Sequence, residues 1–273
     1  SLYLLSCTCR SGLLGGIGLS FKMEYAMLKP LIAGNWKMNG LKSSLTEAES
    51  LVEGLSQGNC SADVLICPPA TLIDRMVSVF DGNDVSVGGQ DCHANVSGAH
   101  TGDISAEMIS DLGGAFVIVG HSERRTDHGE SNSVVREKAE AALRAGITPI
   151  VCIGETLEQR EAGETLSVLG DQIKNSIPPG VSGDQYVVAY EPVWAIGTGL
   201  VPETSDIDTA HNFLRSKLKE IGVENADKVR LLYGGSVKPS NAAEILGVAE
   251  VNGALVGGAS LKAADFLGII AGA

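Results

Sequence analysis

The chain has few aromatic residues and a deficit of basic ones. Phe, Trp and Tyr make up 4% of its 273 residues, and the formal net charge is −13 at pH 7. A stacking platform for single-stranded nucleic acid needs more rings, and a surface for a phosphate backbone needs clustered Lys and Arg. The composition therefore argues against nucleic acid as a partner. A small anion can still bind through local backbone amides and one Lys.

Long apolar runs and metal-type cysteine pairs are also missing. No stretch reaches the ~18 apolar residues of a membrane span, so we expect no membrane association. The cysteines are scattered without a CxxC pair and predict reduced thiols and a cytoplasmic protein: Cys7, Cys9, Cys60, Cys67, Cys92 and Cys152. Cys152 lies inside an apolar run and is expected to be a buried small hydrophobe. Cys7 and Cys9 could bind metal, although an unstructured tail is the simpler interpretation.

No GxGxxG motif follows the first apolar run, where a doubly wound dinucleotide fold needs its phosphate turn. Eight apolar runs instead alternate with helical stretches and predict strands at 31–35, 64–67, 85–88, 116–119, 149–153, 186–190, 229–233 and 254–256. Eight strand-helix units over about 250 residues suit an α/β fold of one domain, a closed (β/α)8 TIM barrel. The doubly wound sheet remains the structural alternative.

Two of the connecting helices show clear end signals. The first is predicted over 44–55, where Ser44 and Glu47 have the spacing of a capping box. The second is predicted over 131–145, with Gly146 where a left-handed C-cap is expected. Residues 27–273 are therefore interpreted as the barrel domain. Residues 1–26 lack core periodicity and are expected to be a non-core extension or a misplaced start, with a faint likeness to a transit peptide.

Polar side chains follow several of the predicted strands. Glu191 follows the predicted strand 186–190 and precedes a glycine-rich segment that contains Trp194. Asn35 and Lys37 lie at the end of the first strand, and His121 follows the fourth. In a (β/α)8 barrel these strand ends meet at the catalytic face. Each residue taken alone also fits a role without function: Glu191 as a carboxylate facing water, Lys37 as a solvated cation and His121 as a structural histidine.

Pairs of glycines follow the seventh and eighth strands, at 234–235 and 257–258. Without a Cβ, backbone N–H groups can converge on an anion, and the loops after these two strands often bind phosphate in such barrels. Either pair alone is an ordinary tight turn. Together they predict a phosphate site.

Five segments together resemble the triosephosphate isomerase family: GNWKMN (34–39), GHSERR (120–125), AYEPVWAIGTG (189–199), YGGSV (233–237) and LVGGASL (255–261). The resemblance spans residues 31–270 in the family's order. It implies interconversion of dihydroxyacetone phosphate and D-glyceraldehyde 3-phosphate through an enediolate, in glycolysis and gluconeogenesis, with no metal and no organic cofactor. The pairing of a glutamate base with a neutral histidine is well established for this enzyme.

The resemblance also implies a role for each matching residue. Glu191 is similar to the catalytic base, and His121 to the neutral imidazole that polarises the carbonyl, its charged form disfavoured by a helix N-terminus. Lys37 and Asn35 would bind substrate and stabilise negative charge, and Glu123 would assist near Lys37. The expected phosphate ligands are backbone groups of Gly197, Ser236, Gly257 and Gly258.

Two further features follow from the resemblance. Residues 89–103 are similar to the loop by which family members form homodimers, with Thr101 reaching the partner's active site; a mobile surface loop is the alternative. The segment Leu200-Val201-Pro202 departs from the family's usual lid hinge, and Pro202 should restrict its open states. Two other functions stay open, a phosphate-binding aldolase or lyase and a non-catalytic barrel. The first commonly needs a Schiff-base Lys or a metal, and the second would be expected to have lost Lys37, His121 or Glu191.

Overall fold

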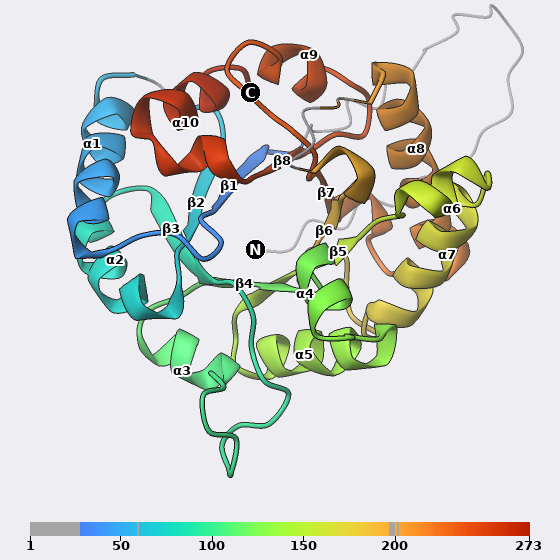
Figure 1. The fold of residues 1–273 in the computed structure, drawn as a ribbon, viewed down its shortest axis with the longest axis horizontal. Coiled ribbons are helices and arrows are strands. Elements are labelled where there is room, and N and C mark those ends of the chain that lie inside the picture. Colours follow the sequence, from blue (N-terminus) through green and yellow to red (C-terminus); the bar gives the residue numbers. More distant parts are fainter. Residues whose placement is uncertain (1–27, 59, 197–199, 201) are drawn as a thin grey trace, which may run out of the picture.

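The structure is a computed structural model that describes residues 28–273 except 59, 197–199 and 201. Eight parallel strands form a closed barrel in chain order, and β8 pairs with β1 to close it (Figure 1). The strands are β1 Leu31–Asn35, β2 Asp63–Cys67, β3 Val85–Gly89, β4 Phe116–Val119, β5 Thr148–Ile153, β6 Val187–Tyr190, β7 Arg230–Tyr233 and β8 Gly253–Val256. The predicted barrel is therefore confirmed, and the doubly wound alternative was wrong.

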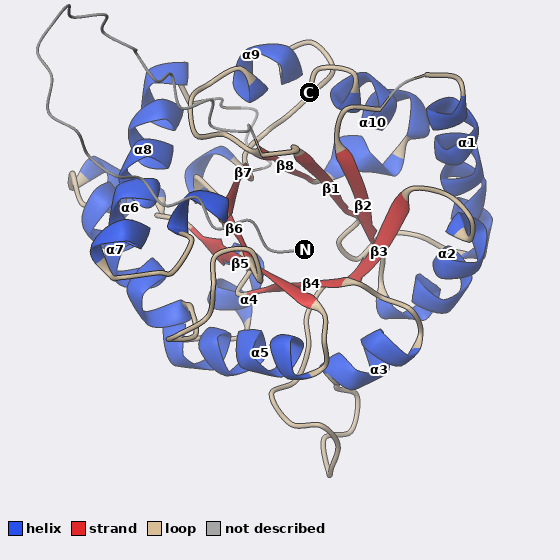
Figure 2. Cartoon of the chain, turned by 180° about the vertical axis from the view of Figure 1, so that it is seen from behind, coloured by secondary structure: helices blue, strands red, loops and turns tan. Residues whose placement is uncertain are grey.

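Helices surround the barrel on its outside, as the view from behind shows (Figure 2). The α-helices are α1 Leu45–Ser56, α2 Ile73–Phe80, α3 Ala106–Asp111, α4 Ser122–Asp127, α5 Asn132–Arg144, α6 Leu157–Glu161, α7 Thr165–Ser176, α8 Thr204–Glu220, α9 Ala242–Leu246 and α10 Ala263–Ile270. Short 3-10 turns include Val193–Ala195 after β6 and Gly258–Leu261 after β8. None of the helices in the described residues is long and apolar enough to cross a membrane.

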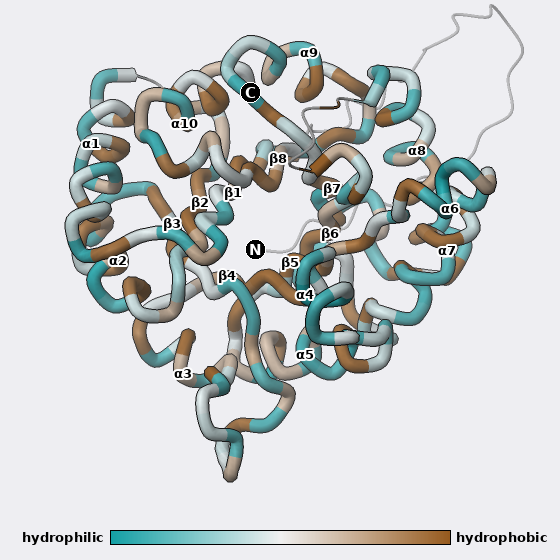
Figure 3. The backbone as a smooth tube through the Cα atoms, viewed as in Figure 1, coloured by the Kyte–Doolittle hydropathy of each residue, from teal (hydrophilic) through white to brown (hydrophobic). Residues whose placement is uncertain are grey.

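Alternate residues of each strand face opposite sides of the barrel wall. Leu31 and Ala33 belong to the apolar cluster inside the barrel, whereas Ile32 between them packs in the larger cluster against the helices. Both faces are dry, so most residues of the strands are apolar (Figure 3). The inner cluster also contains Cys152, which is fully buried as predicted. A filled interior leaves the strand ends as the place for a site.

Of the two helices predicted with clear end signals, the structure confirms the ends of the second and contradicts the capping box of the first. Ser131 caps α5 by accepting a hydrogen bond from the Val134 N–H at 3.3 Å, and Gly146 has a φ of 75° in the left-handed region. The capping box of Ser44 and Glu47 was wrong. Ser44 Oγ instead accepts from the Leu41 N–H, because a 3-10 turn precedes α1. The Glu47 carboxylate accepts from the Ala263 N–H at 2.9 Å, at the first residue of α10.

Candidate active site

A cavity of about 290 Å³ lies at the carboxyl ends of the strands. The lining residues come from the segments that follow β1, β4, β6, β7 and β8, and they include Asn35, Lys37, His121, Glu191, Ser236, Gly257 and Gly258. Residues separated by more than 200 positions thus meet in one small volume. Among the described residues, the structure brings together all those predicted to form the site within one chain. Glu123 lies beside them, in contact with Lys37.

Glu191 lies directly after β6 and is 1% exposed. Its N–H donates to the Ile153 carbonyl at 2.7 Å, so the barrel ladder fixes its backbone. One carboxylate oxygen lies 2.9 Å from Nε2 of His121, and the other accepts from the Ser122 N–H at 3.0 Å. Burial raises the pKa of this carboxyl, but the charge and hydrogen bond of His121 and the Ser122 N–H together lower it by more, so the net pKa is lowered.

His121 is the N-cap residue of α4, and the Glu123 N–H points at its Nδ1 at 3.3 Å. This contact makes Nδ1 the acceptor and leaves Nε2 to carry the proton that faces Glu191. Burial lowers the pKa of His121, but the adjacent Glu191 carboxylate raises it by more. The net direction is upward, opposite to the lowering expected from the helix N-terminus. A helix end acts through partial charges, whereas Glu191 contributes a full charge in direct contact.

Lys37 has an unusual backbone at the end of β1. Its φ is 51°, a left-handed conformation that non-glycine residues rarely adopt. Two contacts hold it there, because the Lys37 N–H donates to Oδ1 of Asn35 at 3.0 Å and the Gln90 side chain donates to the Lys37 carbonyl at 2.8 Å. The Nζ atom lies 2.7 Å from Oε1 of Glu123. Since Oδ1 of Asn35 is occupied, its NH2 group is the part able to donate to a ligand.

The glycine turns after β7 and β8 also line the cavity. Gly257 lies beside the Lys37 stem, since a Cβ added there would be 3.6 Å from Lys37 Cε. Ser236 Oγ donates to the Ala195 carbonyl at 3.3 Å, which ties the loop after β7 to the turn that precedes the glycine-rich segment. The predicted ligand Gly197 lies outside the described residues, as does Val201 of the hinge.

Several residues near the site were not predicted. Ser122 positions Glu191 and Gln90 positions Lys37 through long-range contacts, which no local sequence pattern reveals. Glu155 is fully buried and accepts hydrogen bonds from Trp194 Nε1 at 2.9 Å and Tyr190 OH at 3.2 Å. It anchors the start of the glycine-rich segment. The sequence pattern that selected Glu191 could also have found Glu155, because Glu155 is likewise a carboxylate shortly after an apolar strand.

Thr101 does not join the cavity of its own chain. It is exposed on the loop between β3 and α3, which extends away from the barrel (Figure 1). The structure therefore places this predicted site residue away from the cavity of its own chain.

A buried carboxylate and imidazole in contact, with an ammonium and glycine turns around one small cavity, define a (β/α)8-barrel enzyme of the acid-base type with an anionic substrate. Residues 30–273 match the family model described as triosephosphate isomerase. The chain belongs to the triosephosphate isomerase family.

The chain is similar in sequence to named triosephosphate isomerases over nearly their whole length. The triosephosphate isomerase of Rhodopseudomonas palustris (strain BisA53) is 60% identical over 251 residues, and that of Bradyrhizobium sp. (strain ORS 278) is 59% identical over 246. Each match covers 90% of this chain and 98% of the relative. The crystal structure of triosephosphate isomerase from Bartonella henselae superposes with a TM-score of 0.84 at 46% identity, covering 90% of this chain and 99% of that one.

Proposed function

We propose that Glu191, His121, Lys37 and Asn35 perform the family's reaction in this chain. That reaction interconverts dihydroxyacetone phosphate and D-glyceraldehyde 3-phosphate and is a step of glycolysis and gluconeogenesis. The observation that carries the assignment is the 2.9 Å contact between Nε2 of His121 and Oε1 of Glu191 inside the cavity. A base and an N–H donor this close together could serve a proton on a substrate carbon and the oxygen beside it, which supports the proposal.

Glu191 acts as the base that removes the proton α to the carbonyl and returns it to the neighbouring carbon. Its present contacts with Ser122 and His121 stabilise the carboxylate and lower its pKa. A substrate that enters between Glu191 and His121 replaces these contacts. The carboxylate then loses stabilising hydrogen bonds in a drier site, which raises its pKa toward that of an effective base.

His121 donates a hydrogen bond from its Nε2–H to the oxygen on which negative charge develops. The Glu123 N–H at Nδ1 keeps that proton on Nε2, as the donor role requires. Lys37 adds a positive charge held in place by Glu123, and Asn35 adds a neutral donor. Glu123 touches Lys37 rather than the centre of the cavity, so we assign it a positioning role.

The glycine turns receive the phosphate. Ser236, Gly257 and Gly258 line the same cavity as Glu191, and Lys37 lies beside Gly257. We propose Gly197 as a further ligand when the glycine-rich segment closes over the substrate and excludes water from the enediolate.

The direct test is a coupled isomerase assay on the purified chain. We expect turnover in both directions without added metal or organic cofactor. An aldolase of the Schiff-base type would instead be trapped by borohydride at Lys37, but an ammonium paired at 2.7 Å with Glu123 is a poor nucleophile. Absence of isomerase activity in the folded chain would leave the non-catalytic barrel.

We also propose a homodimer in which Thr101 reaches the partner's site. Met38, next to Lys37, is 96% exposed, and the wall of the pocket beside it includes Pro69, Ala70 and Ile73 together with charged residues such as Asp91 and Arg124. The loop between β3 and α3 carries a second exposed apolar side chain, Val96, at 51%. Burying these groups in a symmetric contact would cover Met38 and brace the Lys37 backbone. Light scattering should give twice the mass of the chain, and a monomer with full activity would contradict the proposal.

We place the protein in the cytoplasm. The described cysteines, Cys60, Cys67, Cys92 and Cys152, are free thiols, which fits a reducing compartment. Cell fractionation tests this placement.

A further inference from the structure

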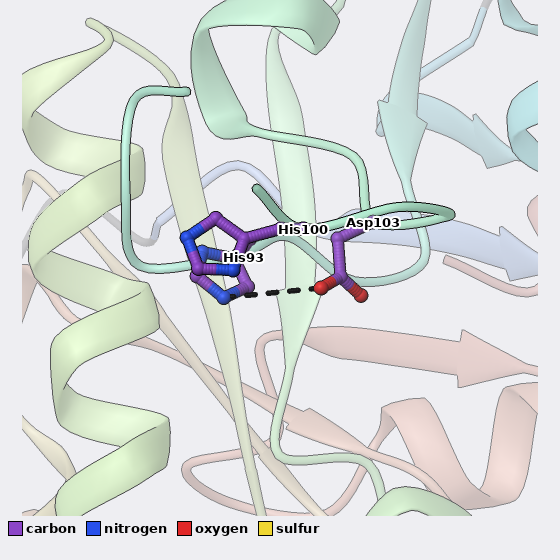
Figure 4. Close-up of side chains that lie close together, drawn as sticks. All are labelled: His93, His100 and Asp103. Carbon is purple, nitrogen blue, oxygen red and sulfur yellow. Dashed lines mark ion pairs between the residues drawn. The ribbon is translucent and has the colours of Figure 1, made fainter. Parts of the chain in front are cut away.

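Two groups of polar side chains lie outside the residues assigned to the reaction. The first consists of His93, His100 and Asp103, on the loop between β3 and α3 (Figure 4). That loop belongs to the proposed subunit contact. The second surrounds the side chain of Arg125 on α4, the helix that follows His121. Its contacts lie within one chain and lead to both members of the catalytic pair.

Arg125 holds the backbone of His121 on both sides. Its Nε donates to the Gly120 carbonyl at 2.9 Å, and its own backbone N–H donates to the His121 carbonyl at 3.0 Å. The carbonyls before and after the imidazole-bearing residue are thus bonded to one residue. Gly120 has a φ of 67°, and a Cβ there would lie 2.6 Å from a methyl group of Val135. The chain therefore leaves β4 along a path that requires glycine, and Arg125 fixes that path.

The same guanidinium reaches the end of β5. Its Nη2 donates to the Cys152 carbonyl at 3.1 Å. The ladder between β4 and β5 stops one residue before Cys152, so Arg125 supplies the partner that a longer ladder would have supplied. The next carbonyl along β5, that of Ile153, accepts the Glu191 N–H at 2.7 Å. Arg125 is therefore connected to Glu191 through one peptide unit of β5.

The four acceptors of the Arg125 side chain, within the part of the chain that the structure describes, are neutral oxygens. Besides the two carbonyls they are Oδ1 of Asn132 at 2.8 Å and Oγ of Ser176 at 3.1 Å. Ser176 is fully buried and donates to Oδ1 of Asn132 at 3.2 Å, so these two acceptors brace each other. Several neutral acceptors in fixed directions suit the planar fork of an arginine, whereas a lysine offers a single point of attachment.

We propose that Arg125 is a positioning residue whose guanidinium fixes the distance between His121 and Glu191. It holds His121 through Gly120 and holds Glu191 through the end of β5. The two reacting groups lie 2.9 Å apart, from Nε2 to Oε1. A displacement of about 1 Å in such a group can cost about 100-fold in rate. The inference rests on the proposed isomerase reaction for its kinetic consequence, but the distance itself can be tested without turnover.

The experiment compares Arg125→Lys with the parent chain. Lys keeps the charge but cannot reach both carbonyls, so kcat should fall by at least about tenfold while KM changes little. Inhibition by inorganic phosphate should be unchanged, because the glycine turns after β7 and β8 make none of these contacts. Arg136→Lys is the matched control, because Arg136 on α5 also donates to a main-chain carbonyl, that of Lys174, at 3.2 Å. Its kcat should equal that of the parent.

A nuclear magnetic resonance titration of His121 measures the geometry independently of turnover. Burial lowers the pKa of His121, and the contact with Glu191 raises it by more. A wider gap in Arg125→Lys should therefore lower this pKa, since the other charges facing the ring, those of Lys37 and Glu123, are kept. A role of Arg125 in global stability alone would leave the pKa unchanged. An inactive parent chain would refute the proposed reaction, and this titration would still test Arg125.

Asn132→Ala is a milder second variant, for use if Arg125→Lys does not fold. It removes one neutral acceptor and keeps both carbonyl contacts of Arg125, so kcat and the pKa of His121 should fall by less than in Arg125→Lys. The proposal is overturned if folded Arg125→Lys has the parent's kcat or the parent's His121 pKa. Loss of phosphate binding in step with kcat would also overturn it, because the whole cavity would then have changed. If only Asn132→Ala folds, parent values of both quantities in that variant overturn the proposal.

Discussion

The ammonium of Lys37 lies 2.7 Å from the Glu123 carboxylate, 86 positions further along the chain. The contact joins the end of β1 to the helix that follows β4. Glu123 also donates its backbone N–H to His121, so one residue positions both the cation and the imidazole of the site. Positive charge and the N–H donor are thereby held on the same side of the cavity before a substrate arrives.

Lys37→Met should lower kcat/KM by at least about 100-fold, because a fixed charge aimed at the developing anion is lost. Lys37→Arg should recover little, since a planar fork cannot occupy the position of a point charge. Lys262→Met is the matched control, because that exposed lysine forms a 2.9 Å ion pair with Glu47 away from the cavity. Steady-state kinetics check all three. Normal turnover by Lys37→Met would show that Lys37 is only a solvated cation.

The pKa of His121 should fall in Glu191→Gln. The carboxylate that raises this pKa is removed, whereas the burial that lowers it remains. The imidazole should therefore become cationic only at lower pH than in the parent chain. A nuclear magnetic resonance titration of the ring nitrogens measures the shift and reports whether Nε2 carries the proton at neutral pH. Glu220→Gln, an exposed carboxylate paired with Lys217, is the control. An unchanged or higher pKa would contradict the coupling.

Gly234→Ala should displace Glu191. The backbone of residue 234 is outside the left-handed region, so alanine adds no conformational strain there. A Cβ at residue 234 would lie 2.9 Å from Glu191 Cγ, closer than real contacts allow, so the distance between Glu191 and the loop after β7 must change. We expect kcat to fall by about tenfold or more, since small displacements of a reacting group are costly. Gly58→Ala is the control, because a Cβ there meets no atom within 4 Å. Equal kcat values for both variants would show that the packing of Gly234 against Glu191 has no catalytic consequence.

Residues defined by local patterns were predicted well. The strand that ends at Asn35 begins and ends where the apolar run does, because both faces of a barrel strand are dry. Gly146 needs a left-handed backbone, and its place after a periodic helix revealed that need. Lys37 and Glu191 could be selected as candidates because they follow such strands.

Features that depend on distant contacts could not be predicted. Glu47 has capping-box spacing, yet Ala263, at the opposite end of the chain, takes its carboxylate. The left-handed backbone of Lys37 depends on Gln90, which lies on another strand end. The raised pKa of His121 depends on Glu191, so only the assembled site gives its direction.

A chain that starts at Met27 should keep its kcat/KM and melt within a few degrees of the full chain. The residues assigned to the site begin at Asn35, and the sequence before Met27 lacks core periodicity. Kinetics and a thermal melt of the two chains side by side test this. Loss of soluble expression or of self-association on truncation would show that residues 1–26 are structural.

The central claim is that Glu191 is the base, and the kcat of Glu191→Gln tests it most directly. The amide matches the carboxylate in size but cannot accept the proton, so kcat should fall by at least about 100-fold. Binding of phosphoglycolate, a dianion that resembles the enediolate, should show that the phosphate site and the fold persist. A variant that binds phosphoglycolate and turns over at nearly the parent rate would contradict the account.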